Sequence, residues 1–475
     1  MSASVSAFVL TAGLVAEATG GTLVSGDPGR IFNHVAIDSR TIAAAPISAH
    51  TPGTLFVALR GEARDGHAFV PEAIQRGVAG VLVSSLPLVA GHAAVIVVPD
   101  PLAALQRLGR EVRRRSGATV VAITGSAGKT TTKEAIAACL APRFRVFRNE
   151  GNLNNHIGLP LSLLELRHGP EVAVVELGMN HAGEIRELVA LAAPDVRVWI
   201  NVGNAHIGHF GSVEAIADAK AEILEGATAA TVVVANADDP LVMRHVERCP
   251  ARVRTFGVDA RADVQAMRVE DRGFDGIRAE VSTPWGPLAL SLALAGRPNL
   301  LNVLAAATVA LELGVPAADV SRAAAGLAAV SRRGALSTLA NGARLVDDSY
   351  NASPAAVRVM LATLAATRTS GRRIAVLGEM LELGDAARAL HAGTGRAAAE
   401  AGVDLLVAIG GPAADGLVEG AREAGLDAGR ILRFADSASA AGPVAELVRA
   451  GDLVLVKGSN GTRTNIVANR LREVA

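Results

Sequence analysis

The chain has 475 residues, half of them apolar and only 3% aromatic, a length and composition typical of a folded protein of about three domains. This composition excludes a chain that is disordered as a whole. Lys plus Arg and Asp plus Glu number 46 each, and this zero net charge gives no electrostatic reason to expect binding to nucleic acid or to an anionic membrane.

The first apolar stretch, residues 7–18, is interpreted as part of a folded domain rather than as a signal peptide. It lacks a positively charged start, contains Glu17 and continues into Gly20 and Gly21. No uninterrupted run of 18 apolar residues follows anywhere, so we expect no membrane-spanning segment. The two cysteines, Cys139 and Cys249, are too few for a disulfide framework and favour a reducing compartment. We therefore expect a cytoplasmic protein.

Residues 1–112 contain short apolar segments separated by turn residues, a pattern that favours a mixed α/β domain. The basic run 110–115 at its end is interpreted as a solvated linker or helix face rather than as a phosphate-binding track. The predicted strands of this block are 35–37, 54–59, 80–83 and 95–98, with a predicted helix at 71–76.

Continuous apolar segments alternate with helical patterns in the next block, 113–330. Such segments are typical of strands buried on both faces of a parallel sheet, and the alternation predicts repeated βαβ units. The block 331–475 repeats this pattern, and the stretch near 325–335 is the expected hinge between the two. The predicted strands are 119–124, 172–177, 196–202 and 231–235 in the first of these blocks, and 374–377, 405–409, 431–434 and 453–456 in the second.

The segment 124–131, Thr-Gly-Ser-Ala-Gly-Lys-Thr-Thr, lies between a predicted strand and a predicted helix that begins near Thr130. Glycines there let backbone N–H groups face an anion, and the helix N-terminus adds a favourable partial charge. Lys129 can reach the outer phosphates of a nucleotide, and the Thr130 hydroxyl can bind Mg²⁺. The alternative, a glycine turn before an ordinary helix, does not explain the Lys-Thr pair directly after the second glycine.

Two side chains follow neighbouring predicted strands at the ends where ligands collect in open α/β sheets. Glu176 ends the strand 172–177, and a carboxylate at that position can face phosphates through a metal. His206 follows the strand 196–202 at the equivalent end. A lone histidine is usually structural, but this position favours a second metal ligand.

Lys220 is unusual because helical spacing places it on the apolar face of the segment 212–224. A lysine there must extend its amine to solvent, pair with a carboxylate, or lose its charge. The sharper hypothesis is that the neutral amine takes up CO₂ and becomes a carbamate, an oxygen ligand for Mg²⁺.

Taken together, these segments resemble the ATP-dependent Mur ligase family of peptidoglycan precursor synthesis. The resemblance implies an α/β fold of three domains: a mixed α/β UDP-sugar substrate domain (1–112), a central P-loop ATPase-type parallel-sheet domain (113–330), and a Rossmann-like domain (331–475) that completes the ATP and amino-substrate site. The motifs that carry it are 37–40, 53–59, 65–67, 125–131, 151–160, 176–181, 201–206, 297–302, 347–354, 377–384 and 457–459.

The resemblance also implies roles for individual residues. Those implied in catalysis are Lys129, His206, Lys220 and Arg333. Those implied in ATP binding are Gly125, Ser126, Ala127, Gly128, Lys129, Thr130, Thr131, Asn299, Asn302, Arg333 and Asp348. The implied substrate-binding residues are Ser39, Arg40, Asn154, Asn155, Tyr350, Asn351, Lys457 and Ser459. The implied metal ligands, for two Mg²⁺ ions, are Thr130, Glu176, His206 and a carbamylated Lys220.

The sequence departs from the family pattern at two places. Arg332 stands where a glycine is usual before the family arginine, so either Arg332 or Arg333 could contact phosphate. After 457–459 the chain continues with Asn460 and Gly461 instead of the usual Arg-Ala. The second departure weakens the transfer of C-terminal substrate contacts, but not of the ATP or metal sites.

The implied activity is ATP-dependent amide-bond formation between UDP-N-acetylmuramoyl-tripeptide and D-alanyl-D-alanine through an acyl phosphate, by a monomer. The third residue of the tripeptide, diaminopimelate or lysine, stays open. Three alternatives are a folate polyglutamate synthase-like ligase, a P-loop switch or motor ATPase, and a catalytically silent binding module. The first would not need residues 38–40, the second gives no reason for the segment around Asp348, and the third would tolerate loss of Lys129, Glu176 and Lys220.

Overall fold

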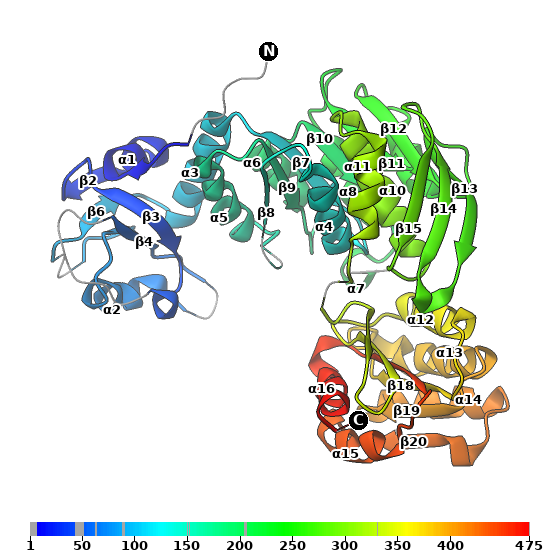
Figure 1. Cartoon of the computed structure of the whole chain (residues 1–475). Coiled ribbons are helices and arrows are strands. Elements are labelled where there is room, and N and C mark those ends of the chain that lie inside the picture. The colour runs from blue at the N-terminus through cyan, green and yellow to red at the C-terminus, as the bar shows by residue number, and fades with distance from the viewer. Residues whose placement is uncertain are drawn as a thin grey trace.

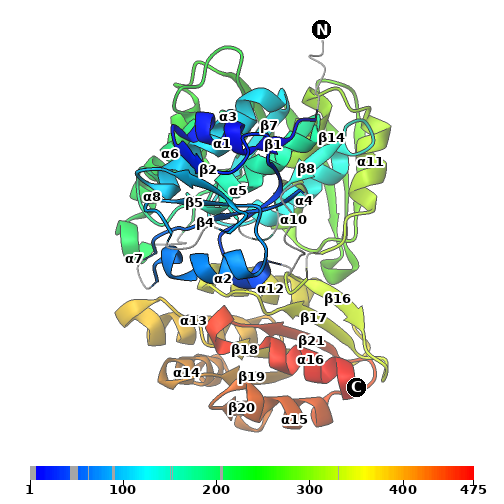
Figure 2. The ribbon, with the colours of Figure 1, turned by 90° about the vertical axis from the view of Figure 1, so that its left-hand side faces the viewer.

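A computed structural model describes residues 7–42, 52–61, 64–87, 91–149, 151, 153–203, 207–329 and 331–474. Three sheets follow one another along the chain, as predicted, with six, nine and six strands. In Figure 1 the first sheet lies to the left, the second at the upper right and the third beneath the second. Figure 2, turned by 90°, shows the C-terminal part below the two others.

The N-terminal sheet is mixed, in the order β1-β3-β4-β5-β6-β2. Its four inner strands, β3 to β6, are parallel, and β1 and β2 pair antiparallel at its two edges. The predicted mixed α/β domain is therefore confirmed. Its elements are β1 (Leu10–Thr11), α1 (Ala12–Thr19), β2 (Thr22–Ser25), β3 (Ile31–Ala36), η1 (Ser39–Thr41), β4 (Gly53–Val57), η2 (Gly66–Phe69), α2 (Val70–Gln75), β5 (Gly80–Val83) and β6 (Ala94–Val97).

Helix α3 (Pro101–Ser116) leads from the first sheet to the second. It begins where the Asp100 carboxylate caps two backbone N–H groups and where Pro101 supplies a favourable φ. Its apolar face joins side chains of the N-terminal sheet and of the central sheet in one continuous core. The basic run 110–115 lies on this helix, where Glu111 pairs with two exposed arginines as expected for a solvated helix face. Arg113 is the exception, because its side chain is 12% exposed and pairs with Asp195 of the central domain.

The central sheet has the order β15-β14-β13-β12-β11-β10-β7-β9-β8, and the strands from β8 to β13 are parallel. Its elements up to the last parallel strand are β7 (Thr119–Thr124), α4 (Lys129–Leu140), β8 (Val146–Arg148), α5 (Gly158–Leu164), β9 (Val172–Glu176), α6 (Glu184–Ala192), β10 (Val196–Trp199), α7 (Ile207–Phe210), α8 (Val213–Ala221), β11 (Val232–Asn236), α9 (Pro240–Val246), β12 (Arg252–Gly257) and β13 (Val264–Asp271).

The far edge of the central sheet is antiparallel, which the sequence analysis did not anticipate. In β14 and β15 buried and exposed side chains alternate, as expected for strands with one face in solvent, so they lack the continuous apolar run used to find the parallel strands. Helices α10 and α11 cover the other face. The remaining elements are β14 (Ile277–Ser282), β15 (Leu288–Leu292), α10 (Arg297–Glu312) and α11 (Ala317–Ala325).

The C-terminal sheet has the order β16-β17-β21-β18-β19-β20, parallel except for β16. Apolar clusters cover both of its faces, as a buried parallel sheet requires. Its elements are β16 (Ala335–Thr338), β17 (Arg344–Asp348), α12 (Pro354–Ala366), β18 (Arg373–Gly378), α13 (Ala387–Glu400), β19 (Leu405–Ile409), α14 (Asp415–Glu423), β20 (Ile431–Phe434), α15 (Ser437–Leu447), β21 (Leu453–Lys457) and α16 (Asn465–Val474).

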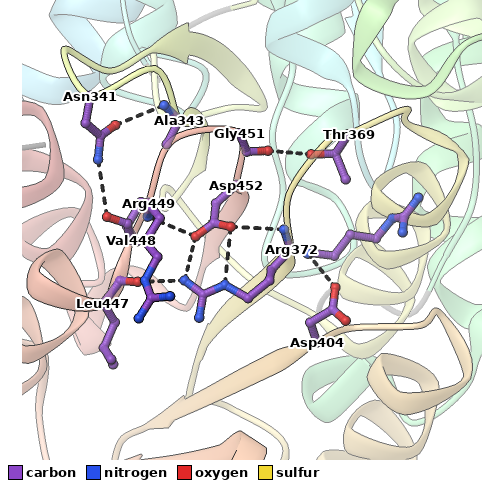
Figure 3. Close-up of polar contacts among 11 residues, drawn as sticks. Asn341, Ala343, Thr369, Arg372, Asp404, Leu447, Val448, Arg449, Gly451 and Asp452 are labelled. Atoms are coloured by element: carbon purple, nitrogen blue, oxygen red, sulfur yellow. Dashed lines mark hydrogen bonds and ion pairs between the residues drawn. The ribbon is translucent and has the colours of Figure 1, made fainter.

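A polar network closes the amino-terminal end of this sheet (Figure 3). The Asp452 carboxylate accepts hydrogen bonds from the Arg372 backbone and side chain and from the Arg449 N–H, at 2.7 to 3.3 Å. The same Arg372 guanidinium donates to the Leu447 carbonyl at 2.6 Å. This network fixes the turns that precede β18 and β21.

Phe274 attaches the central domain to the C-terminal domain. It lies in the turn between β13 and β14, is 2% exposed, and packs among apolar side chains of α12 and the C-terminal sheet. Its N–H donates to the Thr367 hydroxyl at 2.8 Å. In the same turn Asp275 pairs with Arg344 at 2.7 Å. No helix in the described part of the chain combines the length and the apolar character needed to cross a membrane.

Candidate active site

The glycine-rich loop connects β7 to α4, as predicted. Gly128 stands directly before α4 with φ of 86°, and a Cβ at this position would lie 2.5 Å from Oδ1 of Asn302. Both the backbone conformation and the close approach therefore require glycine. The residues implied in phosphate binding, 125–131, all lie in this loop and the first turn of α4.

A second loop, which follows β10, holds the glycine-rich loop in place. The Asn201 side chain accepts from the Ala127 N–H and donates to the Ala127 carbonyl, both at 3.0 Å. The Ser126 hydroxyl donates to the Gly203 carbonyl at 3.2 Å and accepts from the Gly203 N–H at 2.8 Å. The sequence analysis gave Asn201 no role, although it follows a strand whose end faces ligands.

Lys129 lies among charged groups from three parts of the chain. Its Nζ donates to the Gly125 carbonyl at 2.6 Å. Burial lowers its pKa; the negative charge of Glu176 opposes this shift, and the positive charge of Arg333 adds to it. Lys129, Glu176 and Arg333 are therefore close enough to interact, although Arg333 belongs to the chain beyond α11.

Glu176 ends β9 and carries a carboxylate oxygen suited to a metal. Its side chain is 2% exposed, and its Oε1 atom has no hydrogen-bond partner among the described residues. The nearest cation is Lys133, whose Nζ lies 3.5 Å from Oε1. A buried carboxylate oxygen without a donor fits a hard cation such as Mg²⁺.

Lys133 is a charged residue of this site that the sequence analysis missed. It is 1% exposed, and its Nζ donates to the Asn149 carbonyl at 2.6 Å. It follows Lys129 by four residues and lies on the buried face of α4, beside Ile136. The criterion that singled out Lys220, a lysine on an apolar helix face, would have found it.

Lys220 lies on the buried face of α8 and is 2% exposed. Burial, with a smaller contribution from the positive charge of Lys129, lowers its pKa to about 7. No carboxylate pairs with it and no hydrogen bond holds its amine among the described residues. Of the three outcomes open from the sequence, the loss of its charge agrees best with these surroundings.

A cavity of about 420 Å³ lies between the central domain and α12. One of its lining residues, Asn201, also contacts the glycine-rich loop. Asn302 reaches it from α10, and Asn299, one turn earlier, accepts a hydrogen bond from Asn302 at 3.4 Å without lining the cavity itself. The lining residues are Asn201, Asn236, Asp271, Gly296, Arg297, Pro298, Leu301, Asn302, Val359, Ala362 and Thr363.

The carboxyl-terminal end of the C-terminal sheet brings Asp348 and Lys457 together from β17 and β21. Nζ of Lys457 lies 2.5 Å from Oδ2 of Asp348 and donates to the Asn351 carbonyl at 2.9 Å. Burial raises the pKa of Asp348, although the positive charges of Lys457 and Arg333 act in the opposite direction. The Asp348 carboxylate therefore has one strong hydrogen-bond donor, which offsets only part of the cost of burying its charge.

The two consecutive arginines 332 and 333 both lie near the Tyr350 ring, with Cζ atoms 5.9 and 4.1 Å from its centroid, but they make different polar contacts. The Arg333 guanidinium lies 4.1 Å above the Tyr350 ring and close enough to Lys129 and Asp348 to affect their pKa values. Arg332 instead donates to Ser349 and to the Asn460 side chain. The geometry therefore favours Arg333 as the arginine that faces the glycine-rich loop.

Comparison with known proteins gives matches to three family models along the chain. The Mur ligase family catalytic domain matches residues 32–148, the Mur ligase middle domain 123–310, and the Mur ligase glutamate ligase domain 332–460. A relative from Bacillus subtilis, UDP-N-acetylmuramoyl-tripeptide–D-alanyl-D-alanine ligase, is 34% identical over 97% of both chains. The chain belongs to the Mur ligase family.

Solved structures of Mur ligases agree with this assignment. A crystal structure of MurF from Acinetobacter baumannii superposes with a TM-score of 0.88 at 30% identity, covering 98% of this chain and 99% of that one. The MurF ligase of Thermotoga maritima in complex with ADP gives a TM-score of 0.79 at 29% identity, over 93% and 97% of the two chains. The three-domain α/β fold predicted for this Mur ligase is thus confirmed.

His206, implied as a catalytic residue and metal ligand of this Mur ligase, lies outside the described residues. The described residues contain no group of three or more His, Cys, Asp or Glu side chains able to hold a metal. Among the implied metal ligands, Thr130 belongs to the first turn of α4, and Glu176 and Lys220 both lie near Lys129.

The implied substrate residues of the first two domains make local contacts. The Ser39 hydroxyl donates to Glu72 at 3.0 Å, and Arg40 pairs with Asp38, all within the N-terminal domain. Asn155 accepts from two N–H groups at the start of α5, so it acts as a helix cap. The Asn154 side chain lies 2.8 Å from the position of a Cβ on Gly178, beyond the end of β9.

The implied substrate residues of the C-terminal domain lie on neighbouring loops. The Ser459 hydroxyl accepts from the Leu381 N–H at 2.9 Å and joins the loops after β21 and β18. Tyr350 is 37% exposed and lies against Arg333. The Asn351 carbonyl accepts from Lys457, which also pairs with the Asp348 carboxylate.

Proposed function

We propose that this Mur ligase joins D-alanyl-D-alanine to UDP-N-acetylmuramoyl-tripeptide and converts ATP to ADP and phosphate. The observation that carries the proposal is the match over 97% of the chain to a ligase of that name. The arrangement of Lys129, Arg333 and Asp348 around the glycine-rich loop supports it, because a nucleotide bound there would contact both domains.

The reaction forms an amide from a carboxylate, whose oxygen is a poor leaving group. Attack of the tripeptide carboxylate on the γ-phosphorus of ATP forms an acyl phosphate and releases ADP. The neutral amine of D-alanyl-D-alanine then attacks the acyl carbon, and the tetrahedral intermediate collapses as inorganic phosphate leaves and the amine loses a proton. The protein mainly has to position the reactants and offset their negative charge.

We assign the roles of charge and position to named side chains. Lys129 and Arg333 offset charge on the transferred phosphoryl group from opposite domains, and Asp348 accepts from the ATP ribose. Asn302, on the wall of the 420 Å³ cavity, contacts adenine together with Asn299. Closure of the C-terminal domain about residues 325–335 would exclude water, which would otherwise hydrolyse the acyl phosphate.

Mg²⁺ would be held by Thr130 and Glu176, and by His206 and a carbamylated Lys220 at a second position. The orphan Oε1 of Glu176 and the buried Lys220 amine, with its pKa lowered to about 7, support this donor set. Bound Mg²⁺ offsets the charge that would keep a triphosphate and a carboxylate apart. A carbamate on Lys220 would add a hard oxygen ligand in a site that otherwise has few.

Measurement of ADP release with purified UDP-N-acetylmuramoyl-tripeptide, with and without D-alanyl-D-alanine, tests the proposal. We expect release over repeated turnovers to depend on both substrates and to be matched by amide product. ADP release without either substrate would support a P-loop switch or motor ATPase instead. Ligation of glutamate to a folate in place of the tripeptide would support the folate-type ligase.

The carbamate has its own test. Lys220→Ala should lose most activity and recover part of it with a short carboxylic acid, which supplies the missing oxygen ligand. Lys133→Ala, which removes another buried lysine nearby, should show no such recovery. An unmodified Lys220 in a crystal structure, together with no recovery, would count against the carbamate.

The remaining assignments are proposals of the same kind. The domain limits are 1–112, 113–330 and 331–475, and the enzyme works as a monomer in the cytoplasm, without nucleic acid or stable membrane insertion. Size-exclusion chromatography with light scattering tests the monomer.

A further inference from the structure

Arg332 adopts a backbone conformation that favours glycine. Its φ is 62°, and only three other non-glycine residues in the described part of the chain have a positive φ. The conformation is held from both sides, because the Tyr350 N–H donates to the Arg332 carbonyl at 3.1 Å and the Gly334 N–H donates to the Asp347 carbonyl at 3.0 Å. A non-glycine residue kept in this region points to a use for its side chain.

The guanidinium of Arg332 is anchored by neutral groups. Its Nε donates to the Ser349 hydroxyl at 3.1 Å, and its Nη2 donates to the Ser349 carbonyl at 2.7 Å and to Oδ1 of Asn460 at 3.4 Å. These contacts join the chain before β16 to the loops after β17 and β21. Arg332 and Asn460 are also the two main departures from the family motifs, and they touch each other.

No carboxylate offsets the charge of Arg332 in the described part of the chain. The nearest acidic residue along this network is Asp347, which accepts from the Ser349 hydroxyl at 2.6 Å and pairs with Arg472 at 2.6 Å. Asp348 already pairs with Lys457. Arg332 is half-buried, and its Nη1 makes no hydrogen bond among the described residues. A fixed, partly desolvated cation with a free donor is suited to an anionic ligand.

We propose that Arg332 binds the terminal carboxylate of the incoming dipeptide. The inference rests on the proposed function, in which D-alanyl-D-alanine carries a nucleophilic amine at one end and a carboxylate at the other. Arg333 faces the glycine-rich loop and the nucleotide. Arg332 instead contacts the loops after β17 and β21, where it can bind the acceptor dipeptide. The free Nη1 can donate a charge-assisted hydrogen bond to the carboxylate, and this contact would fix the direction of the amine.

The test removes the charge from the protein and from the ligand in turn. KM and kcat are measured for wild type, Arg332→Gln and Arg332→Lys with D-alanyl-D-alanine and with D-alanyl-D-alaninamide, which lacks the carboxylate. We expect Arg332→Gln to raise the KM for the dipeptide about 10- to 100-fold, the range for losing a hydrogen bond to a charged group. Arg332→Lys should recover part of the loss.

The amide acceptor separates binding from a structural role. For wild type, kcat/KM with the amide should be about 10- to 100-fold lower than with the dipeptide. For Arg332→Gln the two values should be about equal, because loss of the guanidinium and loss of the carboxylate remove the same interaction. Arg422→Gln, which removes an exposed arginine at the end of α14, is the matched control and should keep the wild-type preference.

Three results would overturn the inference. One is an unchanged preference for the dipeptide over the amide in Arg332→Gln. Another is a rise in the KM for ATP or for the UDP-linked tripeptide instead, which would assign the anion to a phosphate or to a tripeptide carboxylate. If wild type forms no ADP with tripeptide and dipeptide, the proposed function fails as well, and that failure is seen before any variant is compared.

Discussion

The two ends of the C-terminal sheet each hold an aspartate beside a basic residue, Asp452 buried and Asp348 partly buried, and the number of hydrogen-bond donors to each carboxylate differs. At the amino-terminal end, burial of Asp452 favours the neutral acid, yet hydrogen bonds from Arg372 and from the backbone outweigh it and lower the pKa. At the carboxyl-terminal end, burial raises the pKa of Asp348 despite the ion pair with Lys457. The difference lies in the number of donors and not in burial alone.

This difference separates a structural end of the sheet from a ligand-binding end. Asp452 has its oxygens occupied by the protein, as Figure 3 shows, so nothing is left for a ligand. Asp348 has one strong donor and keeps acceptor capacity. Incomplete compensation of this kind is expected where a substrate completes the hydrogen bonding.

The largest expected effect is on turnover and comes from Lys129, which lies in the central domain close to Arg333 of the C-terminal domain. Lys129→Ala should lower kcat by about 10²–10³-fold, as for the loss of one electrostatic stabiliser of a transition state. The rate of ADP release at saturating substrates measures it. Thermal unfolding should stay near that of wild type, and near-normal turnover would remove Lys129 from the mechanism.

At the structural end, Asp452→Asn should lower the free energy of unfolding by about 1–3 kcal/mol, because an amide NH₂ replaces one of the two buried oxygens that accept N–H groups. Urea unfolding measures it. Turnover per folded molecule should be unchanged, since Asp452 lies at the end of the sheet remote from Asp348. A loss of turnover without a loss of stability would contradict the distinction between the two ends.

Asp348→Asn should give the reverse pattern. We expect kcat/KM for ATP to fall roughly 10- to 100-fold, the range for a hydrogen bond that involves a charged group. The free energy of unfolding should change far less than in Asp452→Asn, because a raised pKa means that ionised Asp348 adds no stability to the fold at neutral pH. Steady-state kinetics with varied ATP, beside urea unfolding, measures both.

The pH dependence of stability should distinguish the same two carboxylates. The folded pKa of Asp452 lies below its unfolded value of about 3.9, so its contribution is present above that value and is lost as the pH falls through the folded pKa. Asp348 has a raised folded pKa, so its contribution is present at low pH and is lost as the pH rises through that pKa.

Urea unfolding between pH 3 and pH 7 tests both signs. Below about pH 4, the stability of Asp452→Asn should fall less steeply than that of wild type. Asp348→Asn should lack the loss of stability that wild type shows as the pH rises through the raised pKa of Asp348. Parallel curves for all three proteins would contradict the assigned directions.

The sequence predicted the parts of this molecule that local patterns encode. In the second and third sheets, continuous apolar runs identified eight of the parallel strands but missed β8, β12, β13 and β17. The glycine-rich segment identified the loop before α4. The antiparallel strands β14 and β15 were missed, because alternating burial is a weaker signal than a continuous run.

Contacts between distant segments were beyond the reach of these patterns. Lys133 lies against Glu176, and Arg332 against Asn460, only because separate loops and strands meet in the folded chain. The sequence placed Arg332 and Arg333 side by side and could not tell which of them faces the glycine-rich loop. Both lie near the Tyr350 ring in the folded chain, but only Arg333 affects the pKa values of Lys129 and Asp348.

The smallest expected effect concerns the turns at the two ends of the sheet. Glu382 in the loop after β18 has φ of 64°, whereas the left-handed positions at the structural end, Gly342 and Gly451, are glycines. Because a Cβ in this region costs about 1–2 kcal/mol, Glu382→Gly should raise the free energy of unfolding by up to about 1 kcal/mol, and Gly342→Ala should lower it by a similar amount. Urea unfolding of both variants measures the pair, and a loss of stability in Glu382→Gly would show that its side chain offsets the strain.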